Sequence, residues 1–84
     1  MPRFLAAHTA PFTEQQLMDL TKQPLQEGFS WKQTYCDFND NKFFCEWEAP
    51  SKEALAEAFN GLSVPFDAIY PVRLFNVAKK GFED

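Results

Sequence analysis

The chain has 84 residues, of which 45% are hydrophobic and 17% aromatic, so it is long enough for one domain and too apolar for a disordered protein. Its formal net charge of −4 argues against nucleic-acid binding, which needs clustered lysines and arginines. No apolar run approaches the roughly 20 residues of a membrane span, and the first residues lack a signal-peptide pattern. We therefore expect a cytoplasmic protein that binds neither nucleic acid nor membrane.

Residues 3–9 predict a short first strand, which Pro11 ends. Thr13 and Gln16 have the spacing of a capping box, so the first helix is expected to begin after Thr13. A proline inside a helix removes a backbone hydrogen bond and clashes with the preceding turn. Pro24 therefore predicts a kink or an early end of this helix.

Residues 29–38 and 42–49 predict two strands of a hairpin, joined by the turn residues Asn39–Asp40–Asn41. A turn centred on Asp40 and Asn41 gathers the apolar side chains on one face of the hairpin. The pairs that this register predicts are Phe38 with Phe43, Cys36 with Cys45, and Thr34 with Trp47. We expect the two cysteines to be buried thiols.

Ser51 predicts the N-cap of a second helix, and Asn60–Gly61 predict its end. Residues 68–77 predict the last strand. Pro71 in that strand lacks a backbone donor, which places the strand at an edge of the sheet.

This order of elements predicts an α+β fold, a ferredoxin-like βαββαβ sandwich with a four-stranded antiparallel sheet and both helices on one face. Residues 1–77 form the predicted domain, and residues 78–84 a polar, frayed tail. The other face of the sheet is expected to be uncovered and to carry Trp31, Gln33, Tyr35, Asp37, Phe44, Glu46 and Glu48. Because exposed aromatic side chains mark partner surfaces, we expect Trp31, Tyr35 and Phe44 to form the interface of a homodimer, a dimeric α+β barrel.

Two sets of residues are candidates for chemistry. His8 is the only histidine; it is a candidate ligand or acid–base group, or an ordinary surface residue at a strand end. On the uncovered face the predicted register sets Tyr35 opposite Glu46 and Gln33 opposite Glu48. This cluster could bind a cation or act as an acid or base, or be part of an ordinary interface.

Four segments resemble a known family: the opening residues 1–5 with His8, then Phe44–Pro50, Gly61–Leu62 and Asp67–Val72. The family consists of small ferredoxin-like bacterial proteins, mostly of unknown function, some described as nickel-binding or nickel-responsive. The resemblance spans most of the chain and implies the ferredoxin-like fold. Family members carry a histidine on the first strand and others on the helices. This chain keeps His8, the one metal ligand that the resemblance implies here, and has Asn60 where a helix histidine is expected.

The leading hypothesis is a small, homodimeric, non-catalytic binding protein for a small ligand or a metal ion such as nickel. The first alternative is a small dimeric α+β barrel enzyme, an oxygenase or isomerase, with His8, Tyr35 or a glutamate as acid or base. The second alternative is a module that binds another protein through its sheet.

Overall fold

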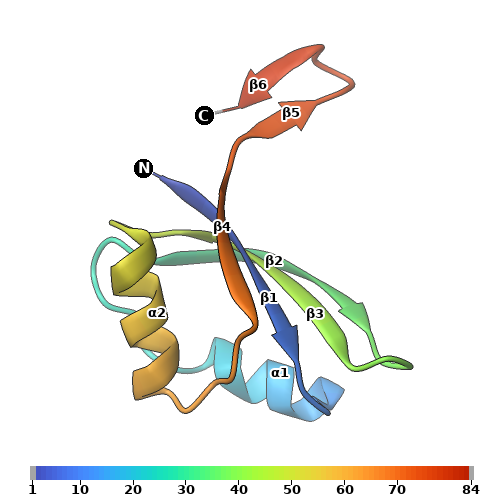
Figure 1. Cartoon of the computed structure of the whole chain (residues 1–84), viewed down its shortest axis with the longest axis vertical. Coiled ribbons are helices and arrows are strands. Elements are labelled where there is room, and N and C mark those ends of the chain that lie inside the picture. Colours follow the sequence, from blue (N-terminus) through green and yellow to red (C-terminus); the bar gives the residue numbers. More distant parts are fainter. Residues whose placement is uncertain (1, 84) are drawn as a thin grey trace.

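The computed structural model describes residues 2–83, which form an α+β fold with one large sheet, two helices and a separate hairpin (Figure 1). The strands of the large sheet are antiparallel, in the order β2-β3-β1-β4. The elements are β1 (Arg3–Thr9), α1 (Glu14–Thr21), β2 (Ser30–Asp37), β3 (Lys42–Glu48), α2 (Lys52–Gly61), β4 (Ala68–Val72), β5 (Leu74–Asn76) and β6 (Gly81–Glu83). The predicted α+β class, with a four-stranded antiparallel sheet and two helices, is confirmed, and β4 is an edge strand as Pro71 predicts.

Both helices lie over the same face of the sheet, which we call the helix face. Alternate strand residues point to it and form most of the core: Phe4, Ala6, Cys45, Trp47 and Ile69, with Leu55 and Phe59 from α2. The predicted caps are present, because the side chains of Thr13 and Ser51 accept hydrogen bonds from the first turns of α1 and α2. Neither helix of residues 2–83 has the length and apolar character that a membrane crossing needs.

Helix α1 is short and packs loosely. It ends at Thr21, before Pro24, as the early end that this proline predicts. None of its side chains is buried, whereas α2 buries Leu55 and Phe59. The space between α1 and the sheet is therefore less completely filled than the space under α2.

The predicted register of the β2–β3 hairpin is wrong by two residues. Cys36 lies opposite Phe43 and Thr34 opposite Cys45, because the turn is centred one residue earlier than expected. The Asp37 carboxylate accepts hydrogen bonds from the backbone N–H groups of Asn39 and Asp40, and Asn41 adopts a left-handed conformation with φ of 56°. A shift of two residues keeps each side chain on its face, but it separates the cysteines. Both cysteines are free; Cys45 is buried and Cys36 is exposed, so only one thiol is in the core.

A β-bulge moves Trp31 to the helix face. The pairing of β2 with β3 shifts between Trp31 and Gln33, so that the strand has one extra residue, Lys32. Trp31 stacks on Trp47 with ring centroids 5.7 Å apart. The prediction that Trp31 lies on the uncovered face is therefore wrong, since strict alternation does not hold across the bulge.

The predicted last strand, residues 68–77, is interrupted after Val72. Val72 pairs with Arg3, which is the first residue of β1, so the edge strand has no further partner in the sheet. The chain instead pairs with itself, β5 with β6, and residues 81–83 are a strand where a frayed tail was expected.

Candidate functional site

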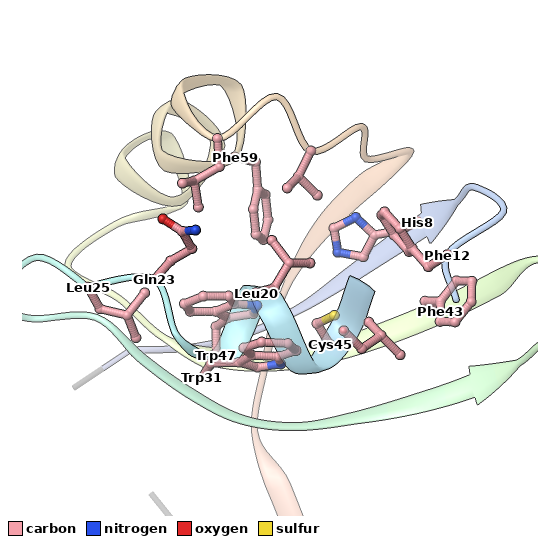
Figure 2. Close-up of a pocket in the computed structure, with 13 residues that line it drawn as sticks. His8, Phe12, Leu20, Gln23, Leu25, Trp31, Phe43, Cys45, Trp47 and Phe59 are labelled. Carbon is pink, nitrogen blue, oxygen red and sulfur yellow. The ribbon is translucent and has the colours of Figure 1, made fainter. Parts of the chain in front are cut away.

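A small apolar chamber lies between α1, α2 and the helix face of the sheet (Figure 2). Its volume is about 40 Å³. One water needs roughly 10–15 Å³ by this measure, so the chamber has room for only a few water-sized groups. The side chains around it are almost all apolar, with His8, Gln23 and Cys45 as exceptions; they are His8, Phe12, Leu17, Leu20, Gln23, Leu25, Trp31, Phe43, Cys45, Trp47, Phe59, Leu62 and Val64.

A larger groove of about 660 Å³ lies beside the chamber, between α2 and the segment that connects α1 to β2. Its lining is more polar and includes Pro24, Gln26, Glu27, Ala58 and Glu57. Four residues line both spaces: Leu25, Trp47, Phe59 and Leu62. The chamber and the groove therefore adjoin, with the Trp47 and Phe59 rings at their junction.

His8 is buried at the end of β1, with 2% of its surface exposed, so the reading as an ordinary surface residue is wrong. Its Nδ1 lies 2.7 Å from the carbonyl oxygen of Pro65. A carbonyl only accepts, so Nδ1 carries the proton and Nε2 of the neutral ring is an acceptor. Burial lowers the pKa of His8, although the Pro65 carbonyl and the charge of Asp67 oppose this shift. The ring also packs edge-on against Phe59, with centroids 5.1 Å apart.

The indole N–H of Trp47 is buried and has no hydrogen-bond partner among the described residues. A buried donor without an acceptor costs roughly 1–3 kcal/mol. The neighbouring Trp31 differs, because its N–H donates to the Thr34 hydroxyl at 2.7 Å. Trp47, which lines both the chamber and the groove, therefore has a donor without a partner among the described residues.

Cys45 lies in the wall of the chamber. The Thr34 hydroxyl lies 3.1 Å from its Sγ and donates to it. Burial raises the pKa of the Cys45 thiol, and the hydrogen bond from Thr34 opposes this shift. The side chain is therefore a neutral thiol at neutral pH, and it is not the thiolate that acts as a nucleophile or binds a metal.

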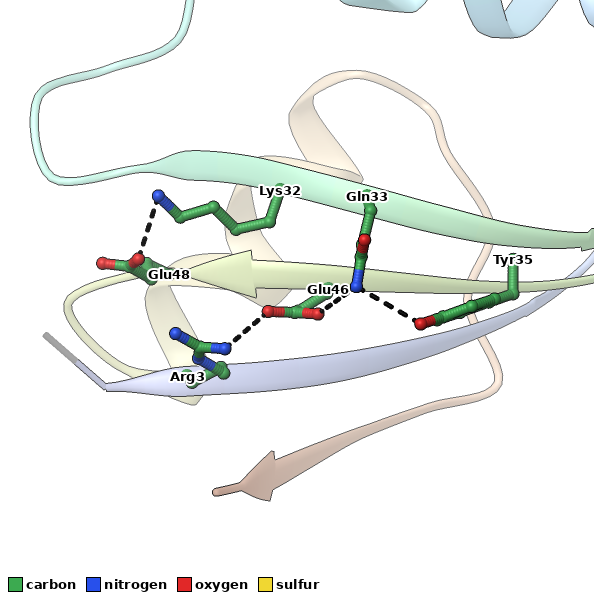
Figure 3. Close-up of polar contacts among 6 residues, drawn as sticks. All are labelled: Arg3, Lys32, Gln33, Tyr35, Glu46 and Glu48. Carbon is green, nitrogen blue, oxygen red and sulfur yellow. Dashed lines mark hydrogen bonds and ion pairs between the residues drawn. The ribbon is translucent and has the colours of Figure 1, made fainter. Parts of the chain in front are cut away.

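The opposite face of the sheet, which we call the open face, carries a polar network centred on Glu46 (Figure 3). Arg3 Nη1 donates to Glu46 Oε2 at 2.8 Å, and Gln33 Nε2 donates to Glu46 Oε1 at 2.9 Å. Gln33 Nε2 also lies 3.3 Å from the Tyr35 hydroxyl. Glu46 is thus a buried carboxylate whose charge Arg3 neutralises.

Glu48 belongs to a second ion pair on the open face. Lys32 Nζ lies 3.0 Å from Glu48 Oε1, and its hydrogen bond lowers the pKa of that carboxyl group. The two glutamates therefore each have a basic partner of their own. They do not form the pair of free carboxylates that a cation site or an acid–base pair would need.

The candidate residues from the sequence thus fall into separate places. The open face brings together Gln33, Tyr35 and Glu46. Their pairing differs from the predicted register by two residues, because Gln33 lies opposite Glu46 and Tyr35 lies opposite Phe44. His8 is on the helix face, and Asn60 is exposed on α2 and lines neither the chamber nor the groove.

Sequence reasoning missed Trp47 and Phe59 as lining residues and Arg3 as the partner of Glu46. Trp47 and Phe59 read as core residues, because an unpaired indole N–H has no signature in a sequence. The contact of Arg3 with Glu46 follows from the β1–β3 register, in which Arg3 pairs with Glu48 and lies diagonally from Glu46.

A family model matches most of the chain. The family model described as "Nickel responsive protein SCO4226-like" matches residues 4–72. No curated protein and no solved structure matches the chain.

The residues around His8 do not fit a nickel ion. Among residues 2–83 no group of three or more His, Cys, Asp or Glu side chains is close enough together to hold a metal. In the chamber the candidate donors are one imidazole, whose Nδ1 is used by Pro65, one protonated thiol and the neutral amide of Gln23. Imidazole is a suitable ligand for nickel, but one imidazole without further strong ligands does not make a nickel site.

Proposed function

This chain belongs to the nickel responsive protein SCO4226-like family, and we propose that it is a non-catalytic, homodimeric binding protein for a small organic ligand. The ligand is flat and mainly apolar and carries one hydrogen-bond acceptor. Its site is the groove beside α2 together with the inner chamber. The observation that carries this proposal is the buried, unpartnered N–H of Trp47, a residue that lines both spaces.

The size and lining of the site support a small molecule. Ligand sites are concave and mostly apolar, with a few placed polar groups, and usually have volumes of about 300–1,000 Å³. The groove alone has about 660 Å³. Trp47 Nε1 is covered in the structure, so a ligand oxygen would reach it only as the surrounding side chains shift. The hydrogen bond would then remove the cost of the unpaired donor, and a ring of the ligand would contact Phe59 and Leu62.

We also propose that the fold is a ferredoxin-like sandwich and that two copies pair through their open faces to form an α+β barrel. Tyr35, Phe44 and Tyr70 are large aromatic residues exposed on that face. Exposed aromatic clusters on a sheet favour a partner, and a second copy of the same face is the simplest one.

Nuclear magnetic resonance of the indole groups tests the ligand site. The chain has two tryptophans and therefore two indole N–H signals, which Trp31→Phe assigns. The probes are acetophenone, whose carbonyl accepts, and ethylbenzene, which has a similar ring and no acceptor. Acetophenone should move the Trp47 signal downfield and saturate, with a dissociation constant on the order of 1 mM. Ethylbenzene should bind without the downfield shift, and Trp31, which already donates to Thr34, should move less.

Matched variants locate the binding. Ala58→Leu fills the groove and should weaken acetophenone binding, whereas Lys52→Leu on the exposed side of the same helix should not. No saturable shift with either probe would overturn the proposal. Nickel chloride, titrated into untagged protein by calorimetry, should give no saturable heat; a saturable signal that His8→Gln abolishes would replace the organic ligand with a metal.

A further inference from the structure

The hairpin at the end of the chain stands apart from the rest of the molecule (Figure 1). β5 and β6 pair with each other and form a sheet separate from the four-stranded one. The radius of gyration is 13.1 Å, against about 12 Å for a compact domain of this length. We call residues 73–83 the arm; it begins directly after the last residue that the family model matches, Val72.

The arm is too small to be stable by itself. A single two-stranded hairpin is at best marginally stable in water. Its two phenylalanines pack on one another, with ring centroids 5.1 Å apart, and Arg73 lies over the Phe82 ring at 4.0 Å. Even so, Phe75 is 52% and Phe82 55% exposed, and Val77 in the turn is 78% exposed. The arm therefore presents an apolar surface that needs a cover.

The open face offers such a cover. The strand registers place Tyr35, Phe44, Ala7 and Ala68 in one row across all four strands. The next row holds Leu5 and Tyr70 beside Glu46, whose charge Arg3 already neutralises. The open face of residues 2–83 is thus an aromatic surface on which Glu46 and Glu48 each pair with a basic side chain, and no described element packs on it (Figure 1).

The charges of the two parts are complementary. Residues 73–84 carry three basic side chains, Arg73, Lys79 and Lys80, and two acidic ones, Glu83 and Asp84, and Lys79 forms an ion pair with Glu83. Residues 1–72 carry five basic and ten acidic side chains. The opposite net charges favour the encounter of an arm with the body of another copy, whereas the like net charges of two bodies disfavour their direct contact.

We propose that the arm is an exchange arm, which in the homodimer lies on the open face of the second copy. Phe75 and Phe82 pack against the aromatic row of Tyr35 and Phe44 of the other copy, and the exchange is reciprocal around a two-fold axis. This inference rests on the homodimer of the proposed function, and it changes how the two copies meet. The arm of the other copy covers Tyr35 and Phe44, so the two open faces join through the arms and not directly sheet to sheet. It is independent of the ligand in the groove.

Molecular mass in solution, by sedimentation equilibrium, tests the arm. The wild-type chain should be a dimer, and both Phe82→Ser in the arm and Phe44→Ser on the open face should raise the dissociation constant of the dimer about thirtyfold or more. Met18→Ser, which removes a similarly exposed apolar side chain from α1, should leave the dissociation constant unchanged. Circular dichroism checks that each variant is folded.

Disulfide trapping then tests the contact itself, in a Cys36→Ser background that removes the exposed thiol. Mixing a Phe82→Cys chain with a Phe44→Cys chain should give a covalent heterodimer, and mixing Phe82→Cys with Lys52→Cys on α2 should not. A wild-type monomer would overturn both the exchange arm and the homodimer. A wild-type dimer that Phe82→Ser leaves intact would overturn the arm alone, and acetophenone binding by the variants reports separately on the ligand site.

Discussion

The two faces of the sheet are built from the same strands but differ in how far their side chains are buried and in how their polar groups are paired. On the helix face, alternate residues of β1 and β3 are covered by α2 and the α1 segment, and even the polar His8 is buried. On the open face, the intervening residues combine exposed aromatics with the Arg3–Glu46–Gln33 network. On the helix face a polar group needs a partner within the core, as His8 has in Pro65, whereas on the open face polar groups pair across neighbouring strands.

Phe43 and Phe44 give the sharpest form of this comparison, since they are adjacent in β3 and differ in exposure, 0% against 40%. Phe43→Ala should lower the free energy of unfolding by about 3–5 kcal/mol, because it leaves a cavity among Phe12, Phe38 and the chamber. Phe44→Ala should cost about 1 kcal/mol or less at concentrations where the chain is monomeric. Urea unfolding of both variants measures the difference, and similar costs would contradict the assignment of faces.

Glu46 and Glu48 form a second matched pair, both on the open face. Glu46→Gln leaves the Arg3 guanidinium without its counter-charge in a site where the Glu46 side chain is 12% exposed, and should cost about 1–2 kcal/mol. Glu48→Gln removes a more exposed ion pair with Lys32 and should cost about 0.5 kcal/mol or less. The same denaturant titrations measure both, and an equal cost would mean that the Glu46 network adds nothing to an ordinary surface pair.

The smallest expected effect is a pH dependence from His8. Burial lowers its pKa in the folded protein below the value of 6.5 in an unfolded chain. Above that value the ring is neutral in both states and stability is at its full level. As the pH falls below it, the unfolded chain takes up the proton first, so the free energy of unfolding decreases until the folded pKa is reached.

The melting temperature should therefore fall from about pH 7.5 to about pH 5, a range that spans the titration of an ordinary histidine. His8→Phe keeps a ring beside Phe59 and should remove this part of the slope. The carboxylates with lowered pKa values, such as Glu48, add their own loss only at more acidic pH, which separates the two contributions. An unchanged slope in His8→Phe would show that His8 is not buried in neutral form.

The sequence allows the fold to be predicted where local signals agree with the apolar pattern. The capping residues Thr13 and Ser51 locate both helices, and Pro71 locates the edge strand. The predictions fail where a shift or an insertion of one residue changes the pairing of a strand or the face on which a side chain lies. A turn displaced by one position moves Cys36 from Cys45 to Phe43, and the extra residue Lys32 moves Trp31 to the other face.

The candidate site was less accessible to sequence reasoning. His8 was a candidate, but nothing in the pattern indicated that it is buried against Phe59 and bonded to Pro65, which are both more than 50 residues away in the chain. The polar residues of the open face were candidates because they alternate with aromatic residues. Arg3 and Lys32, however, neutralise the charges of Glu46 and Glu48. The unpaired donor of Trp47 depends on three-dimensional packing, so no spacing of residues predicts it.

Helix α1 has a capping box but no buried side chain, and this has a kinetic consequence. Segments with few buried contacts open locally at a free-energy cost well below that of global unfolding. The amide hydrogens of residues 14–21 should therefore exchange with deuterium far faster than those of β1 and β3. The chamber beneath α1 would then be reached by solvent, and by small molecules, through transient openings of one short helix while the sheet stays intact.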